Sequence, residues 1–149
     1  MSRSFTVRVA LGAAAGAAAT VAMSGVMLAS YASGRVRKVA PEAITDAALD
    51  EVGGASAPVE KAATVAGHFA YGTANGVLFS LAAPHLPGRG VTKGVLFGLV
   101  LLVVSYGGWV PAVGILPPLD EQKRARFATL TLAHLVYGAV LGWAAGVRA

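Results

Sequence analysis

Four long stretches of this chain carry no charged residue, and this feature constrains the fold more than any other. The stretches cover residues 9–34, 62–88, 94–119 and 127–147. Each exceeds the ~18 residues expected of a membrane-spanning helix, because about 20 residues rising ~1.5 Å each cross a hydrocarbon core of roughly 30 Å. Only helices or closed barrels satisfy their backbone hydrogen bonds in lipid, and these stretches lack the alternation typical of strands.

The sequence therefore predicts an all-α fold, a single integral membrane four-helix bundle of residues 1–149 with the lipid bilayer as its solvent. We expect transmembrane helices near residues 9–31, 62–83, 94–116 and 127–147, and an extramembrane loop at 32–61. Composition agrees, because only 13% of the residues are charged and 56% are apolar, which leaves too few charges for the outer faces of a soluble bundle. The net charge of +5 comes from residues that flank the apolar stretches, so we expect no nucleic-acid partner.

The first stretch also resembles a cleavable signal peptide. Basic residues precede it, and Ser30-Tyr31-Ala32 near its end matches a small-x-small cleavage site. The apolar segment is longer than the ~7–15 residues of a signal, however. It also carries small residues four apart, beginning with Gly12 and Gly16, which favours a retained and packed helix.

Every predicted helix contains small residues at four-residue spacing, which let helix backbones approach closely in lipid. The glycine pairs expected to pack helices are Gly12 and Gly16, Gly72 and Gly76, Gly94 and Gly98, and Gly138 and Gly142. Such pairs join helices within one chain or between chains. They therefore leave open a homo-oligomer or a subunit of a larger membrane complex.

A motif of the form His-x-x-Tyr-Gly-x-x-x-Gly occurs in the second and in the fourth stretch. It begins at His68 and again at His134, and its tyrosines are Tyr71 and Tyr137. Offsets of three, four and eight residues place the motif on one side of a helix. With Asn75, these side chains are predicted to form a polar face inside the membrane, where polar groups turn toward the bundle interior and find partners.

The motif suggests that the chain contains two similar helix pairs. Ser30-Tyr31 near the end of the first stretch matches Ser105-Tyr106 near the end of the third, and a His-x-x-Tyr-Gly helix follows each. The first and third helices run in the same direction. The expected symmetry is therefore a parallel pseudo-twofold axis along the membrane normal.

Two connecting regions carry further expectations. Pro41-Glu42 is typical of a helix start, so we expect a short helix within the long loop, lying at the membrane surface or in solvent. In the third stretch, two glycines and Pro111 predict a kink or an early helix end. Tyr106 and Trp109 suit an aromatic belt at the lipid headgroups.

Basic residues set the expected orientation. The side of the termini holds Arg3, Arg8, Arg89, Lys93 and Arg148, and the opposite side holds Arg35, Arg37, Lys38, Lys61, Lys123, Arg124 and Arg126. The second set is larger. Both termini are therefore expected on the same side, with the loops at 32–61 and 117–126 in the cytoplasm.

Four interpretations of His68 and His134 stay open at this stage: hydrogen-bonded links between helices, a proton-responsive element, a bis-histidine haem or metal site, and a solute pathway. No uncharged stretch holds an acidic residue to orient a histidine, and no hydrolase or phosphate-loop motif is present, so we expect no enzyme and no catalytic residue. No cysteine is available for a thiolate metal site, and we predict no metal and no firm cofactor.

Several segments together resemble a known family. They are Met23-Ser24, Pro41-Glu42, His68-Phe69-x-Tyr71-Gly72, the segment from Ser105 to Ala112, Leu116-Pro117-Pro118, and the segment from Ala133 to Gly142. The chain is similar to small bacterial inner-membrane proteins of unknown function, with YagU-like proteins as relatives. The resemblance implies four membrane helices in a bacterial inner membrane and supplies no activity.

From these observations we expect a non-enzymatic role, as a structural or stress-related membrane component or a subunit of a membrane complex. One alternative is a small oligomeric transporter or channel that uses the His and Tyr face. Another is a haem- or quinone-associated membrane subunit that uses His68 and His134.

Overall fold

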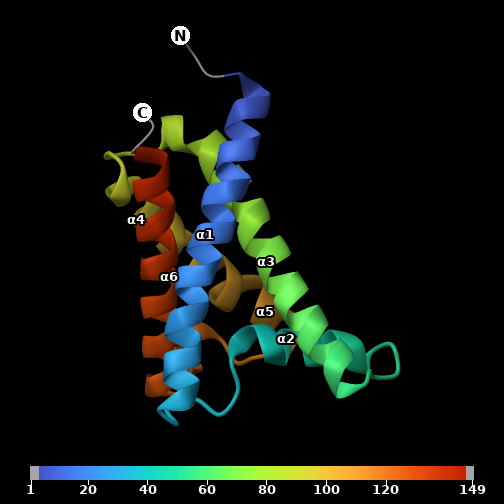
Figure 1. Cartoon of the computed structure of the whole chain (residues 1–149). Coiled ribbons are helices and arrows are strands. Elements are labelled where there is room, and N and C mark those ends of the chain that lie inside the picture. Colours follow the sequence, from blue (N-terminus) through green and yellow to red (C-terminus); the bar gives the residue numbers. More distant parts are fainter. Residues whose placement is uncertain (1–3, 147–149) are drawn as a thin grey trace.

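The computed structural model describes residues 4–146, which fold into helices joined by short connections (Figure 1). The long helices are α1 (Phe5–Ala32), α3 (Ala57–Ala82), α4 (Val91–Val104) and α6 (Arg124–Gly146), with the shorter α2 (Ala40–Asp50) and α5 (Val110–Ala112). A π-helical turn, η2 (Ser105–Trp109), joins α4 to α5, and the turns η1 (Ala83–His85) and η3 (Leu119–Glu121) lie in connections. The prediction of an all-α protein is confirmed. Three residues used in the predictions lie outside the described residues: Val147, which ended the predicted fourth helix, and Arg3 and Arg148, which were counted for the orientation.

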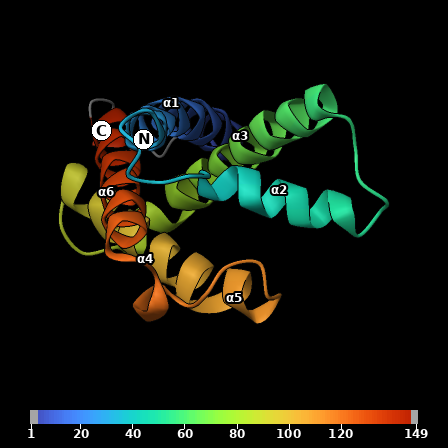
Figure 2. The same cartoon turned by 90° about the horizontal axis from the view of Figure 1, so that it is seen from below.

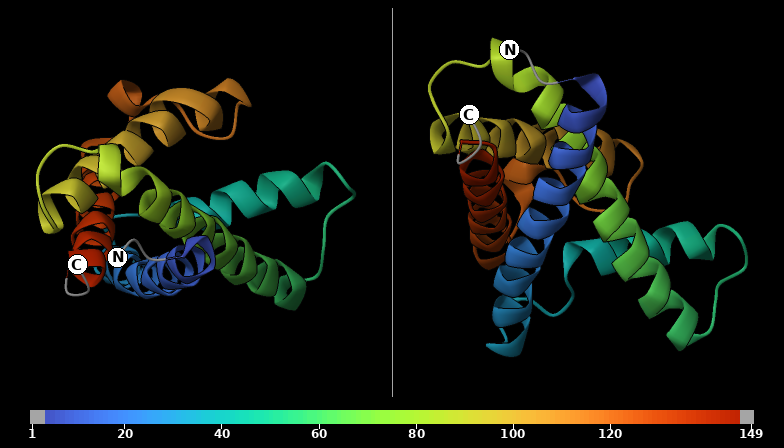
Figure 3. Two further views of the ribbon diagram at one scale, coloured as in Figure 1. Left: turned by 90° about the horizontal axis from the view of Figure 1, so that it is seen from above. Right: turned by 45° about the horizontal axis from the view of Figure 1, so that its top comes forward.

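The long helices form a row in which α1 and α6 are the inner pair. α3 packs on α1, α1 on α6, and α6 on α4. The outer helices α3 and α4 diverge from each other, as the views along the bundle show (Figures 2 and 3). α2 packs against α3 at the end of the bundle, next to the space between the diverging helices. The row is therefore curved, with an interior that α2 borders at one end.

The ends of the helices are stabilised by capping side chains and by prolines in the first turn. Ser4 begins α1 by accepting a hydrogen bond from the backbone N–H of Val7 at 3.4 Å, and prolines occupy the first turns of α2 and α3, where no N–H is needed. The predicted helix start at Pro41-Glu42 is confirmed. At its other end, α3 is capped by Arg8, which donates to the carbonyls of Ser80 at 2.7 Å and Leu81 at 3.1 Å.

Three helical segments of the described chain are long and apolar enough to cross a membrane: α1, the segment Val91–Ala112 and α6. The prediction of membrane-spanning helices is confirmed to this extent. α3 is 26 residues long but less apolar, because its sequence includes Glu60, Lys61, His68 and Asn75. Its crossing of the membrane stays a prediction.

The predicted break near Pro111 is present, one turn earlier than the proline itself. Gly108 has a non-helical backbone (φ −121°, ψ −105°), and the N–H of Val110 bonds to the carbonyl of Ser105. The placement of Tyr106 in an aromatic belt was wrong. The π-turn carries Tyr106 inward, where it is 5% exposed and packs with Leu102, Val110 and others in the core, while Trp109 stays partly exposed.

Candidate functional site

The site begins with two close helix crossings built on glycine. At the crossing of α1 and α3, a Cβ on Gly16 would lie 2.6 Å from the carbonyl oxygen of Gly72 and 2.9 Å from the Cα of Gly76. A Cβ on Gly12 would lie 2.7 Å from the carbonyl oxygen of Gly76. Apart from the side chain of Ser80, which also lies close to Gly12, these neighbours are backbone atoms that cannot rotate away, so a side chain at either glycine would push the helices apart.

The crossing of α4 and α6 uses the second set of glycines in the same way. A Cβ on Gly94 would lie 2.5 Å from the backbone nitrogen of Gly142 and 2.6 Å from its Cα. A Cβ on Gly98 would lie 3.2 Å from the Cα of Gly138. All eight glycines singled out in the sequence therefore sit at two crossings within this chain.

When the two halves of the chain are aligned on their glycine crossings, the two Ser-Tyr segments do not align with each other. Gly16 meets Gly72 and Gly76 as Gly94 meets Gly138 and Gly142. Ser30 follows Gly16 by fourteen residues, whereas Ser105 follows Gly94 by eleven. The side chain of Ser30 bonds to Thr129, and that of Ser105, in the π-turn, to Tyr71. The Ser-Tyr segments thus occupy different environments, and the tandem repeat stays a prediction.

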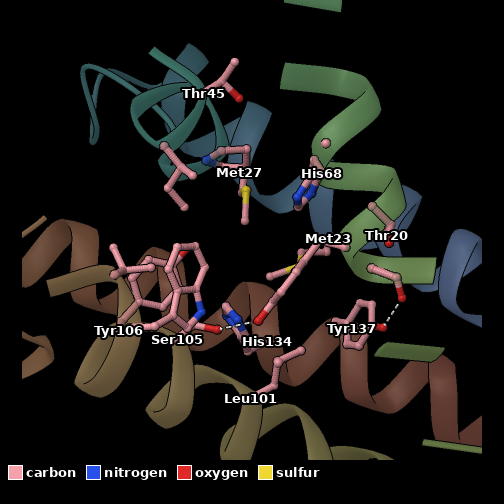
Figure 4. Close-up of a pocket in the computed structure, with 17 residues that line it drawn as sticks. Thr20, Met23, Met27, Thr45, His68, Leu101, Ser105, Tyr106, His134 and Tyr137 are labelled. Carbon is pink, nitrogen blue, oxygen red and sulfur yellow. Dashed lines mark hydrogen bonds between the residues drawn. The ribbon is translucent and has the colours of Figure 1, made fainter. Parts of the chain in front are cut away.

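Beside these crossings the helices border a partly open cavity of about 210 Å³ (Figure 4). Residues of α1, α2, α3, α6, the end of α4, the π-turn η2 and α5 contribute to its wall. The residues of α1 and α2 are Thr20, Met23, Met27, Pro41, Ile44 and Thr45, those of α3 are Gly67, His68, Tyr71 and Gly72, and the remainder are Leu101, Ser105, Tyr106, Trp109, Val110, His134 and Tyr137. The wall is mainly apolar, with a few polar side chains that converge from several helices.

His134 enters the cavity from α6 and is held in one orientation. Its Nδ1 lies 2.8 Å from the carbonyl oxygen of Leu130, which can only accept, so Nδ1 carries the hydrogen. The ring of Tyr106 meets the imidazole edge-on, with ring centroids 5.7 Å apart and planes at 89°. In the neutral ring, Nε2 then has a free lone pair.

His68 enters from α3, and the close-up shows it on the other side of the cavity from His134 (Figure 4). Its Nε2 is one of two buried side-chain polar atoms without a hydrogen-bond partner in residues 4–146; the other is Oγ1 of Thr131. Unpartnered buried polar atoms are uncommon in folded proteins and call for an explanation. His68 is therefore a wall residue with a polar atom that no other described residue satisfies.

Each tyrosine of the motif forms a hydrogen bond that connects two elements of the cavity wall. Tyr137 donates its hydroxyl hydrogen to the carbonyl oxygen of Gly72 at 2.6 Å and so links α6 to α3. The hydroxyls of Tyr71 and Ser105 share a hydrogen bond at 3.0 Å, which links α3 to the π-turn. Asn75 turns back onto its own helix and donates to the carbonyl oxygen of Tyr71 at 2.9 Å.

The structure thus brings four residues of the predicted polar face to one cavity: His68, Tyr71, His134 and Tyr137. Asn75 is buried outside it. Sequence reasoning missed the contributions of α2 and of the α1 methionines to the cavity. It noticed Ser105 only outside the predicted polar face, and it expected Tyr106 at the lipid headgroups. The inward turn of Tyr106 depends on the π-turn, for which the Gly-Gly pair was the available signal. Among the described residues, no group of three or more His, Asp or Glu side chains is close enough to hold a metal ion.

Comparison with known proteins adds one finding. The model of a family of unknown function, DUF6789, matches residues 6–149. No curated protein and no solved structure matches the chain. The chain therefore belongs to DUF6789.

Proposed function

We propose that this member of DUF6789 is a four-helix, multi-pass protein of a bacterial inner membrane that binds a small lipid-soluble molecule without transforming it. The observation that carries the proposal is the cavity: apolar walls, a few oriented polar groups and an unpartnered His68 Nε2. These are the properties of small-molecule sites in proteins. The structural and stress-related roles expected from the sequence fit such a binding protein as well as they fit an inert bundle.

The direction of the chain supports α3 as the fourth crossing. α1 runs from one end of the bundle to the other, and α4 starts again near the first end (Figure 1). The chain must therefore return between these helices, and α3 is the helix that does so. Its 26 residues at ~1.5 Å each give about 39 Å, more than the ~30 Å of a hydrocarbon core. The start of α1 and the end of α6 lie at the same end of the bundle (Figure 1), which supports termini on one side and loops 32–61 and 117–126 on the other. The larger number of basic residues near these loops favours the cytoplasm for them.

The glycine crossings bear on oligomer formation. They join helices of one chain, so they no longer support the expected homo-oligomer or membrane complex. The two similar crossings do support the proposed pair of helix-pair repeats with a parallel pseudo-twofold axis. A native mass in mild detergent decides the oligomeric state.

The volume favours a small organic molecule over a haem. At about 210 Å³ the cavity is below the ~300–1,000 Å³ of typical ligand pockets. A haem is larger than this cavity, so a haem between His68 and His134 would require the helices to separate. We therefore propose that the two histidines hydrogen-bond to a ligand rather than ligate iron.

Photolabelling tests the proposal. The purified protein in lipid nanodiscs is irradiated with a phenyl diazirine, and labelled residues are identified by mass spectrometry. We expect label on Met23 and Met27, which line the cavity, in addition to label on lipid-facing residues such as Leu28, which is 61% exposed. Ile44→Trp, which fills the cavity from α2, should abolish the methionine label, and Leu28→Trp should not. Equal methionine label in the two variants would refute the binding cavity.

A further inference from the structure

The cavity also specifies what kind of molecule fits it. We propose, resting on the binding function above, that the ligand is a hydroxylated aromatic ring with an apolar tail, a hydroquinone-type lipid, and that the site prefers the hydroquinone to the quinone. The proposal depends on the size of the cavity, the hydrogen-bonding state of the two imidazoles and the direction in which the bundle opens.

Size limits the part of the ligand that is enclosed. An engineered apolar cavity of about 150 Å³ holds one benzene molecule. A cavity of about 210 Å³ therefore holds one six-membered ring with small substituents, and excludes a phospholipid headgroup or a coiled acyl chain. Met23 and Met27 line it, and thioethers make favourable contacts with aromatic rings.

The state of His134 selects a ligand that donates a hydrogen bond. Its Nδ1–H is committed to the carbonyl of Leu130 at 2.8 Å, and the edge-on ring of Tyr106 fixes the imidazole plane. The remaining nitrogen, Nε2, can only accept in the neutral ring. A ligand hydroxyl satisfies it, whereas a quinone carbonyl or an ether oxygen does not.

His68 supplies a second polar position on a different helix. Its Nε2 is buried and unpartnered within residues 4–146, and the ring faces the cavity from the side opposite His134 (Figure 4). A ring with two hydroxyls on opposite carbons presents one polar group to each imidazole. The same ring packs its faces against the apolar wall.

The opening of the bundle provides a path for a tail. The outer helices α3 and α4 diverge on the side of the π-turn and α5 (Figures 2 and 3). Tyr71 and Trp109 line the cavity there, are 41% and 39% exposed, and have ring centroids 6.3 Å apart. These rings pack against each other, so an apolar tail would leave past the outer edge of the pair, where both side chains are exposed, and enter the lipid there.

Competition against the phenyl diazirine label on Met23 and Met27 tests the ligand class. Three competitors are added to nanodiscs: decylhydroquinone, decylquinone and the dimethyl ether of decylhydroquinone, which has the same ring and tail but no donor. We expect the hydroquinone to compete about tenfold more strongly than either of the others, the effect of one net hydrogen bond. His134→Phe should keep the methionine label and reduce the preference for the hydroquinone over the other two competitors, because the nitrogen that only accepts is gone. His85→Phe, in an exposed turn outside the cavity, should leave the preference intact.

The outcomes separate this inference from the binding function. Methionine label with three equal competitors in the unmodified protein, or with no competition at all, would overturn the hydroquinone assignment and leave the cavity as a binding site. Absence of methionine label would overturn both. Because the comparison of competitors uses the unmodified protein, a folding defect in His134→Phe does not affect the decision.

Discussion

Substitution of Gly76 by alanine should destabilise the fold strongly for so small a change. The new Cβ would lie 2.5 Å from the Cα of Gly16, where carbon atoms normally rest ~3.5–4.0 Å apart. Both groups lie on helix backbones, so α1 and α3 must separate by about 1 Å. Overpacking of this kind costs roughly 1–3 kcal/mol, and the separation weakens neighbouring contacts by a quarter to a half. We expect a loss of about 2–3 kcal/mol in the free energy of unfolding.

The matched control is Gly25→Ala on α1. A Cβ there has no atom within 4 Å, and alanine is a better helix former than glycine by up to about 1 kcal/mol. Unfolding in mixed micelles, followed by circular dichroism and tryptophan fluorescence, should show Gly25→Ala as neutral or stabilising and Gly76→Ala as destabilised. Gly142→Ala at the other crossing should behave like Gly76→Ala. If the free energies of unfolding of Gly76→Ala and Gly25→Ala differ by less than about 0.5 kcal/mol, the close crossing of α1 and α3 does not exist.

Three further predictions concern polar contacts. Tyr137→Phe removes the link from α6 to α3 and should cost about 0.6 to 1.7 kcal/mol of unfolding free energy, the range for hydrogen bonds between membrane helices; no change would contradict the link. Arg8→Met uncaps two carbonyl groups of α3, so amide hydrogen exchange at the end of that helix should accelerate while exchange in α6 stays constant. The hydrogen bond from Lys38 to Asp46 raises the pKa of Lys38 above its ordinary 10.5. Its small contribution to stability is therefore present below pH 10.5 and lost as pH rises through the raised pKa, so the difference from Lys38→Gln should be constant from pH 7 to 9 and vanish at higher pH.

Much of the fold could be predicted because the uncharged stretches and the glycine spacing are local properties. The spacing of His68, Tyr71 and Gly72 fixes them on one side of a helix whatever surrounds it, and the structure places all three at the cavity. The break before Pro111 was likewise predictable from Gly107 and Gly108, since a missing N–H and two flexible residues weaken a helix in any context.

The partners of these side chains could not be predicted, because they depend on how separate helices cross. Tyr71 bonds to Ser105 only because the π-turn brings that hydroxyl toward α3. Tyr106 was expected at the lipid headgroups from its position near a helix end, yet the same turn rotates it into the core beside His134. Ile44 and its neighbours on α2 border the cavity because the long loop folds back, and nothing in their sequence indicates it.

The membrane crossing of α3 is the claim on which the proposed lipid-soluble ligand and the topology both depend, and single-cysteine labelling tests it most directly. The chain has no cysteine, so Ser56→Cys before α3, His85→Cys after it, and Asp120→Cys each introduce one reactive thiol. A membrane-impermeant maleimide applied to intact cells and to inverted vesicles should label Ser56→Cys and Asp120→Cys from one side and His85→Cys only from the other. Labelling of Ser56→Cys and His85→Cys from the same side would show that α3 does not cross the bilayer.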